Sequence, residues 1–128
     1  MMKFRSYCPI TRGLDVYGDK WTLLILREII FHEHTTFKEL SQMPERIATN
    51  TLANRLEKLT TLGLLTKTVS KRNKLVFYYH ATPKAVELMK VIASLVPWSE
   101  KHLYTKKELK DSSKLIDALK ESPNFPTL

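Results

Sequence analysis

The stretch IATNTLANRLEKLTTLGLLTKTVS, residues 47–70, most constrains the fold. Within it, apolar leucines recur at the spacing of one helix stripe, at Leu52, Leu56, Leu59 and Leu62. Gly63 follows at a position typical of the left-handed residue that ends a helix. The next run, LLTKTVS, is rich in β-branched residues, which favour a strand. The sequence therefore predicts a helix over residues 49–62 that leads at once into a short strand.

The polar face of this helix carries side chains that suit a base edge. At about 100° per residue, Asn50 and Asn54 point away from the leucines, and Thr51 and Lys58 lie on one shoulder. Asparagine can bond N6 and N7 of adenine, and threonine can contact the thymine methyl group. Any solvated helix also has a polar face, but Asn and Thr are mediocre helix formers, so propensity does not explain their number here. We take the candidate DNA-reading residues of this helix to be Thr49, Asn50, Thr51, Asn54, Arg55 and Lys58.

The elements on either side of this helix support the same interpretation. Before it, TTFKEL predicts a capping box between Thr36 and Glu39, a short helix over residues 37–42, and a turn at MPERIA. We include Thr36 among the candidate DNA contacts. After it, LLTKTVS and LVFYYHA predict a β-hairpin whose tip, KRNK, carries Lys71, Arg72 and Lys74. These three cations could straddle the DNA backbone or enter the minor groove.

The rest of the chain is expected to be helical. A first helix is predicted over residues 10–17, and Asp19 should cap a buried central helix within KWTLLILREIIFH. Thr82 and Pro83 should begin a helix with a broad apolar face, which Pro97 kinks or ends. WSEKHLYTKKEL should continue as helix, SSKLIDALKES could form a marginal one, and PNFPTL should be loose. The order predicts a mainly α fold with a small β-hairpin, a winged helix-turn-helix, with N- and C-terminal helices for dimerisation.

Composition narrows the class of protein. A chain of 128 residues fits one domain, and its net charge of +8 favours a polyanionic partner or a membrane surface. Residues 45–80 carry seven basic side chains against two acidic ones, so the excess is greatest around the predicted DNA-reading helix. No apolar run is long enough to span a membrane, and the N-terminus lacks a secretory signal. A single cysteine allows no internal disulfide, so we expect a cytoplasmic protein.

Signatures of catalysis or metal binding are absent from the sequence. It has no Gly-rich phosphate loop, no paired carboxylates and no nucleophile motif, so we expect neither an enzyme nor a cofactor. His32 and His34 are better explained by the dipole at a helix C-terminus than by a metal, since no third ligand is suitably spaced. Trp21 and Trp98 are expected to pack in the core or in a dimer interface.

Two motifs point to a known family. GDKWTLLILREI begins at Gly18, and TLANRLEKLTTLGLL begins at Thr51. Together with the cysteine-proline pair at residues 8–9, they resemble the HxlR-type family of bacterial winged helix-turn-helix transcriptional regulators, over about residues 8–98. In that family's pattern Asp19 replaces a glycine. The wing also departs from the pattern, because KRNK stands where prolines are common, and Ala85 stands where a glycine is usual.

The resemblance implies a homodimer that binds a two-fold site in double-stranded DNA and has no enzymatic activity. The family's dimer is joined through its first and last helices. We therefore expect a winged helix-turn-helix domain over residues 1–106 and a C-terminal extension, partly helical or loose, over residues 107–128. The resemblance does not identify an operator, a small-molecule effector, or the sign of regulation.

Cys8 has two interpretations. Some members of the family sense oxidants or electrophiles through a cysteine at this place, and Arg5 and Arg12 nearby in sequence could favour a thiolate. A free cysteine is more often a small buried residue, and we favour that alternative.

Two hypotheses for function follow. In the first, the chain is a sequence-specific DNA-binding transcriptional regulator, with residues 49–62 in the major groove and the basic wing at residues 70–75 on the backbone or in the minor groove. In the second, it is a winged-helix interaction module that binds protein or RNA without a specific operator. The base-reading side chains Asn50, Thr51 and Asn54 favour the first.

Overall fold

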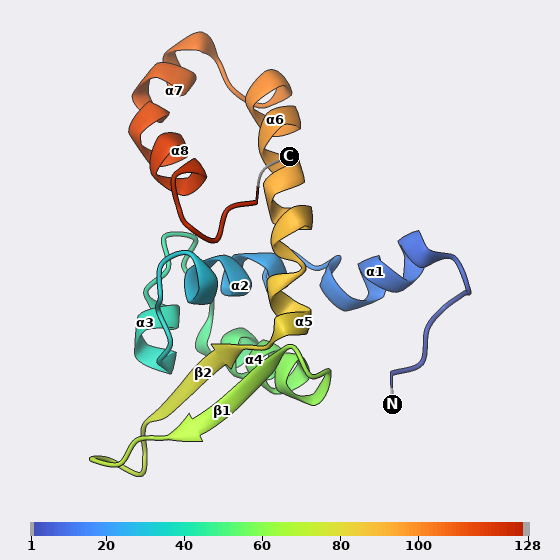
Figure 1. Cartoon of the computed structure of the whole chain (residues 1–128), viewed down its shortest axis with the longest axis vertical. Coiled ribbons are helices and arrows are strands. Elements are labelled where there is room, and N and C mark those ends of the chain that lie inside the picture. The colour runs from blue at the N-terminus through green and yellow to red at the C-terminus, as the bar shows by residue number, and fades with distance from the viewer. Residues whose placement is uncertain (1, 127–128) are drawn as a thin grey trace.

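The computed structural model describes residues 2–126 and is mainly helical, with one two-stranded antiparallel sheet (Figure 1). This confirms the predicted fold class. The elements in chain order are α1 Pro9–Tyr17, α2 Thr22–Ile30, α3 Phe37–Ser41, α4 Thr49–Thr61, β1 Leu65–Val69, β2 Phe77–Ala81, α5 Pro83–Val86, α6 Met89–His102, α7 Lys106–Asp111 and α8 Ser113–Lys120.

The helix α2 forms the centre of the core, as predicted. Its Ile25 and Leu26 are fully buried, and they belong to one hydrophobic cluster with the leucine stripe of α4, Leu52, Leu56 and Leu59. At the start of α2, the Asp19 carboxylate accepts hydrogen bonds from the backbone N–H groups of Trp21 and Thr22 at 2.9 and 3.0 Å. The cap therefore fixes the start of α2, the helix against which α3 and α4 pack.

The ends of α3 and α4 follow their sequence signals closely. Thr36 Oγ1 accepts from the Glu39 amide at 3.2 Å, and the Glu39 carboxylate accepts from the Thr36 amide, which completes the predicted capping box. After α4, Gly63 adopts φ 74°, and the amide of Leu64 donates back to the carbonyl of Leu59 at 2.9 Å. This left-handed C-terminal cap sets the direction in which the chain leaves α4 for β1.

The hairpin is a regular antiparallel pair. Its register runs from Leu65 opposite Ala81 to Val69 opposite Phe77. The strand β2 also meets the segment before α3, because the amide of Tyr79 donates to the Thr35 carbonyl at 2.8 Å, a contact that the sequence analysis did not predict. The hairpin is thus attached to the helix-turn-helix unit at its base, while its tip projects away from the helices (Figure 1).

The predicted C-terminal helices need correction. The helix expected from Pro83 onward is divided into α5 and α6, and Pro97 lies inside α6 instead of ending it. A proline removes one helical hydrogen bond, so it does not by itself stop a helix. WSEKHLYTKKEL is helical at both ends, in α6 and α7, but it is not the continuous helix expected, because α6 ends at His102 and α7 begins at Lys106. Thr105 then accepts from the Glu108 amide in a second capping box, which begins α7.

The tail folds back toward the core instead of being loose. After α8, the amide of Asn124 donates through Nδ2 to the Ile30 carbonyl at 2.9 Å, and the Phe125 ring lies 6.0 Å from that of Phe31. In Figure 1, α7 and α8 run back alongside α6. The last two residues of the predicted loose segment, 127–128, lie outside the described residues. Within residues 2–126, every helix is too short or too polar to cross a membrane.

Candidate nucleic-acid interface

The outer face of α4 begins with the polar residues singled out from the sequence. Thr49, Asn50 and Asn54 are exposed and Thr51 is half-buried, whereas the leucine stripe faces the core. The structure therefore presents the two asparagines to solvent from the first turns of a helix whose opposite side is fixed. That is the arrangement a helix needs to enter a major groove.

Arg55 connects this face to the core helix. Its Nε lies 3.2 Å from Asp19 Oδ1, and its Nη1 donates to Asn54 Oδ1 at 3.2 Å. An amide oxygen has two lone pairs, so Asn54 keeps one acceptor position and both N–H donors. The chain Asp19–Arg55–Asn54 thus orients a candidate base-reading amide from the start of α2.

The pKa of Asp19 reflects this position. Burial by itself would raise the pKa, but the Thr22 hydroxyl, the amides of Trp21 and Thr22, and the Arg55 side chain all hydrogen-bond the carboxylate. Together they lower the pKa to about 2. The carboxylate is therefore charged at neutral pH and can hold Arg55.

Lys58 and Thr36 are also engaged within the protein. Lys58 Nζ donates to the Asp15 carbonyl at 3.4 Å, which ties α4 to α1. The Thr36 hydroxyl accepts from the Glu39 amide and lies 3.0 Å from Glu39 Oε1, so it is committed to the cap of α3. Arg55, Lys58 and Thr36 thus position the helix-turn-helix unit, and their contact with DNA stays a prediction.

The wing carries its cations on an ordered tip. Ser70 Oγ accepts from the amides of Arg72 and Asn73 at 3.2 and 3.3 Å, and Asn73 Oδ1 accepts from the Leu75 amide at 3.0 Å. Lys71, Arg72 and Lys74 are exposed on this turn. The cations were predicted from the sequence but the role of Asn73 was not, although an asparagine in a polar turn is a recognisable signal for such a bond.

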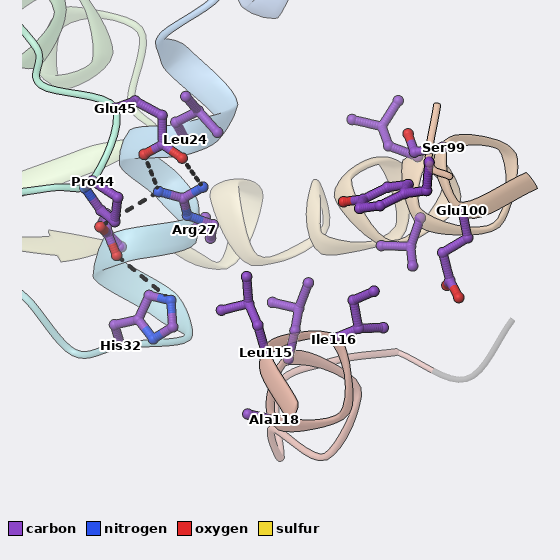
Figure 2. Close-up of a pocket in the computed structure, with 15 residues that line it drawn as sticks. Leu24, Arg27, His32, Pro44, Glu45, Ser99, Glu100, Leu115, Ile116 and Ala118 are labelled. Atoms are coloured by element: carbon purple, nitrogen blue, oxygen red, sulfur yellow. Dashed lines mark hydrogen bonds and ion pairs between the residues drawn. The ribbon is translucent and has the colours of Figure 1, made fainter. Parts of the chain in front are cut away.

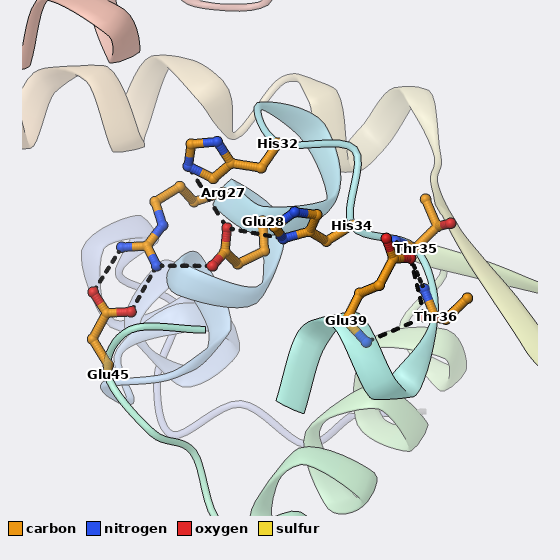
Figure 3. A network of polar contacts seen from close by, with 8 residues as sticks. All are labelled: Arg27, Glu28, His32, His34, Thr35, Thr36, Glu39 and Glu45. Atoms are coloured by element: carbon orange, nitrogen blue, oxygen red, sulfur yellow. Dashed lines mark hydrogen bonds and ion pairs between the residues drawn. The ribbon is translucent and has the colours of Figure 1, made fainter. Parts of the chain in front are cut away.

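A polar network fixes the turn of the helix-turn-helix (Figure 3). Arg27 donates from two nitrogens to the Glu45 carboxylate at 2.7 and 3.0 Å, which joins α2 to the segment between α3 and α4. These bonds lower the pKa of Glu45. This pair was not predicted from the sequence, because the two residues are far apart in the chain and no local pattern connects them.

The two histidines belong to the same network. His32 Nε2 and His34 Nδ1 lie 3.6 and 3.8 Å from Glu28 Oε2, and the Glu28 side chain is 2% exposed. A helix-dipole contact was the expected role, and the structure adds a buried carboxylate as their neighbour. Among the described residues, no three His, Cys, Asp or Glu side chains are grouped as a metal site would require.

Cys8 is exposed, so the expected burial is wrong. It occupies the N-cap of α1, where the backbone N–H groups of Thr11 and then Ile10, at the start of the helix, lower the pKa of the thiol. The neighbouring cations are used elsewhere. Arg5 pairs with Asp15, and the Arg12 guanidinium lies over the Phe4 ring. The helix start therefore replaces the two arginines as the cause of any thiolate character.

Large apolar side chains remain exposed on α1 and α6 and beside them. Ile10 and Leu14 lie on α1, and Trp98 on α6 is 61% exposed, so Trp98 is not a core residue. Trp21, in contrast, packs against the core cluster. In Figure 1, α1 projects sideways from the rest of the molecule. The exposed set is Tyr7, Ile10, Leu14, Leu95, Trp98 and Leu103.

Comparison with known proteins identifies a family model. The HxlR-like helix-turn-helix model matches residues 16–107. The uncharacterized HTH-type transcriptional regulator sll1512 from Synechocystis sp. is 30% identical over 88 residues, which cover 69% of this chain and 64% of the relative. The uncharacterized HTH-type transcriptional regulator Rv3095 from Mycobacterium tuberculosis is 29% identical over 96 residues, or 73% of this chain and 58% of the relative. The chain thus spans under two thirds of the length of either relative.

Solved structures give the same fold. The crystal structure of PA1607 is similar with a TM-score of 0.73 and 30% identity, over 81% of this chain and 71% of that one. The reduced form of the transcriptional regulator YodB from B. subtilis has a TM-score of 0.59 and 23% identity, over 76% of this chain and 95% of that one. The second likeness is informative about the fold alone.

Proposed function

Since the chain belongs to the HxlR-like helix-turn-helix family, whose members are transcriptional regulators and not enzymes, we propose that it regulates transcription by binding specific sites in double-stranded DNA. In this proposal α4 enters the major groove, the wing lies on the backbone or in the minor groove, and two copies bind together. The activity of the whole protein is part of this proposal.

The observation that carries the proposal is the outer face of α4. Asn50 and Asn54 are exposed on consecutive turns, Thr51 lies beside them, and the Arg55–Asp19 pair fixes the helix against the core. Asparagine can bond both adenine N6 and N7, which gives discrimination between bases that a purely basic helix lacks. Lys58 and Arg55 remain candidates for phosphate or guanine contacts at the edge of this face.

The wing contributes DNA affinity that does not depend on the base sequence. Lys71, Arg72 and Lys74 lie on a turn held by Ser70 and Asn73, so they reach the DNA without much further ordering of the backbone. Contacts of this kind release counterions and make binding depend on salt. Thr49 and Thr36, near the starts of α4 and α3, are the remaining candidates for backbone contacts.

Dimerisation is supported by the exposed apolar side chains on α1 and α6. A single small module rarely binds DNA tightly enough alone, and a two-fold pair would cover Ile10, Leu14 and Trp98. Such a pair would place two copies of α4 on one face of the DNA. Cys8, at the start of α1, would then lie close to the dimer interface. An adduct on a sensor cysteine at this place could alter the distance between the two copies of α4.

The direct test is selection of genomic fragments by the purified protein, followed by binding measurements at physiological salt. We expect one or a few fragments to be retained with an affinity about 10³-fold or more above that for random duplex DNA. A ratio near one, with steep salt dependence, would contradict sequence-specific binding. Retention of RNA or of a protein partner in place of DNA would favour the interaction-module alternative.

A further inference from the structure

A cavity of about 470 Å³ lies between the helix-turn-helix and the C-terminal extension (Figure 2). One wall comes from α2 and from the turn at Pro44 and Glu45, a second from α6, and a third from α8. Its volume falls within the range of small-molecule sites. Since α8 lies beyond residues 16–107, this third wall comes from outside the part that matches the family model.

The walls formed by α2, α6 and α8 are mainly apolar. Leu24 faces the cavity from α2, Leu95 and Val96 line it from α6, and Leu115 and Leu119 line it from α8. Leu115 is 71% exposed, so α8 keeps a large apolar side chain at the mouth of the cavity instead of burying it in the core. This composition suits a ligand with a branched or aromatic hydrocarbon body.

The end of the cavity near α2 is polar and acidic. Arg27, Glu28, His32 and Glu45 all line it. Arg27 pairs with Glu45 at 2.7 Å and also lies 3.5 Å from Glu28 Oε1, so one guanidinium faces two carboxylates and the group carries one net negative charge when the imidazoles are neutral. Glu28 is 2% exposed, and its Oε2 has no hydrogen-bond partner among the described residues. A buried carboxylate oxygen in this state favours a neighbouring cation or donor.

The acid at the other side of the cavity does not change this balance. Glu100 on α6 pairs with Lys120 at the end of α8 at 2.9 Å, so that its charge is matched. The polar end therefore has one net negative charge facing an otherwise apolar space. An anionic ligand would place its charge next to Glu28 and Glu45.

We propose that this cavity binds an amphipathic monocation, with its ammonium or amidinium head toward Glu28 and Glu45 and its apolar body between α6 and α8. The residues that carry the assignment are Glu28 for the charge and Leu115 for the apolar wall. A ligand bound here would contact Glu45, in the turn between α3 and α4. Ligand binding is measured without DNA, so a failure to bind the ligand and a failure to bind DNA are separate results.

The test uses 4-phenylbutylammonium and 4-phenylbutyrate, two probes with the same body and opposite charge, in calorimetric titrations at pH 8, where imidazoles are ordinarily neutral. We expect the ammonium probe to bind once per chain and at least about tenfold more tightly than the carboxylate probe. In Glu28→Gln the affinity for the ammonium probe should fall about tenfold, whereas Glu87→Gln, an exposed carboxylate at the end of α5, should leave it unchanged.

Leu115→Ser keeps the test decisive if Glu28→Gln does not fold. Because Leu115 is exposed, its replacement should not affect the core, but it should weaken binding of the ammonium probe several-fold. Leu75→Ser, at the 87% exposed tip of the wing, is the matched control and should have no effect. The proposal is overturned if neither probe binds saturably, if the carboxylate probe binds as tightly as the ammonium probe, or if Leu115→Ser behaves like its control.

Discussion

At the scale of single residues, Asp19 makes more structural contacts than its position in the sequence indicated. Its place before the leucine-rich run predicted a helix cap, and the cap is present. Its bond to Arg55 could not be predicted, because it joins side chains 36 positions apart and depends on how α2 and α4 pack.

We predict that Asp19→Asn destabilises the fold by about 2 kcal/mol at neutral pH, because the folded protein holds the pKa of this carboxyl at about 2, below the ordinary 3.8. A pKa lowered by folding stabilises the protein above the unfolded value and ceases to do so as pH falls through the folded one. The difference between wild type and variant should therefore shrink between about pH 4 and pH 2. Urea unfolding across that range measures it.

The exposed Asp117 on α8 provides the control for this measurement, since Asp117→Asn removes a carboxylate without a comparable cap. It should change the free energy of unfolding little at any pH. If the difference between wild type and Asp19→Asn stays constant from pH 7 down to pH 2, the carboxylate does not hold the start of α2 as the structure indicates.

Cys8 gives a second prediction at this scale. It is exposed at the N-terminus of α1, and the amides of Thr11 and Ile10 lower the pKa of its thiol. We expect it to react with iodoacetamide in the native protein near neutral pH, at a rate that rises with pH through the lowered pKa. For a sensor, DNA affinity should fall after alkylation of wild type but not of Cys8→Ser. Equal affinity before and after modification would leave Cys8 reactive but without a regulatory role.

At the scale of elements, local signals predicted the structure best where a cap or a turn residue is present. The capping box at Thr36 and the left-handed Gly63 fixed the start of α3 and the end of α4 to within a residue or two. The stop of α6 at His102 was missed, although Thr105 and Glu108 form a second capping box within the predicted continuous helix. The contacts of the tail, such as Asn124 with Ile30, depend on tertiary packing and have no local signal.

The wing offers a prediction at the scale of one element. Replacing Lys71, Arg72 or Lys74 singly with Gln should weaken binding to all duplexes alike and lower the slope of log K against log salt by about one unit. Binding isotherms at four or five salt concentrations measure the slope. Lys107→Gln, on the exposed side of α7, is the control. An unchanged slope in all three variants would show that the wing does not touch DNA.

At the scale of the whole molecule, the proposed mode of DNA binding requires a two-fold dimer. We predict a dimer at micromolar concentration in sedimentation experiments, because Ile10, Leu14 and Trp98 leave an apolar surface uncovered in the single chain. Trp98→Lys should shift the protein toward monomer, and Leu75→Lys at the wing tip should not. Footprints should then show two half-sites about 34 Å apart or a multiple of that distance. A wild-type monomer, with and without DNA, would contradict this assembly.

The overall arrangement was predictable because local sequence patterns indicate the order of the elements, a helix-turn-helix followed by a hairpin. The exposure of Asn50 and Asn54 was predictable, since the helix period alone separates them from the leucines. What could not be predicted is which cations are free. Arg55 and Lys58 appeared equivalent to the wing lysines in the sequence, but the fold engages both with groups from the α1–α2 region.

Base reading by α4 is decided by comparing the affinities of the protein for two duplexes. The dissociation constants of wild type, Asn54→Ala and Asn50→Ala are measured for a selected genomic site and for a random duplex at one salt concentration. Each variant should lose about 1–3 kcal/mol on the selected site and little on the random duplex, while Thr61→Ala, at the far end of α4, should match wild type on both. Equal losses on both duplexes would contradict base readout by this helix.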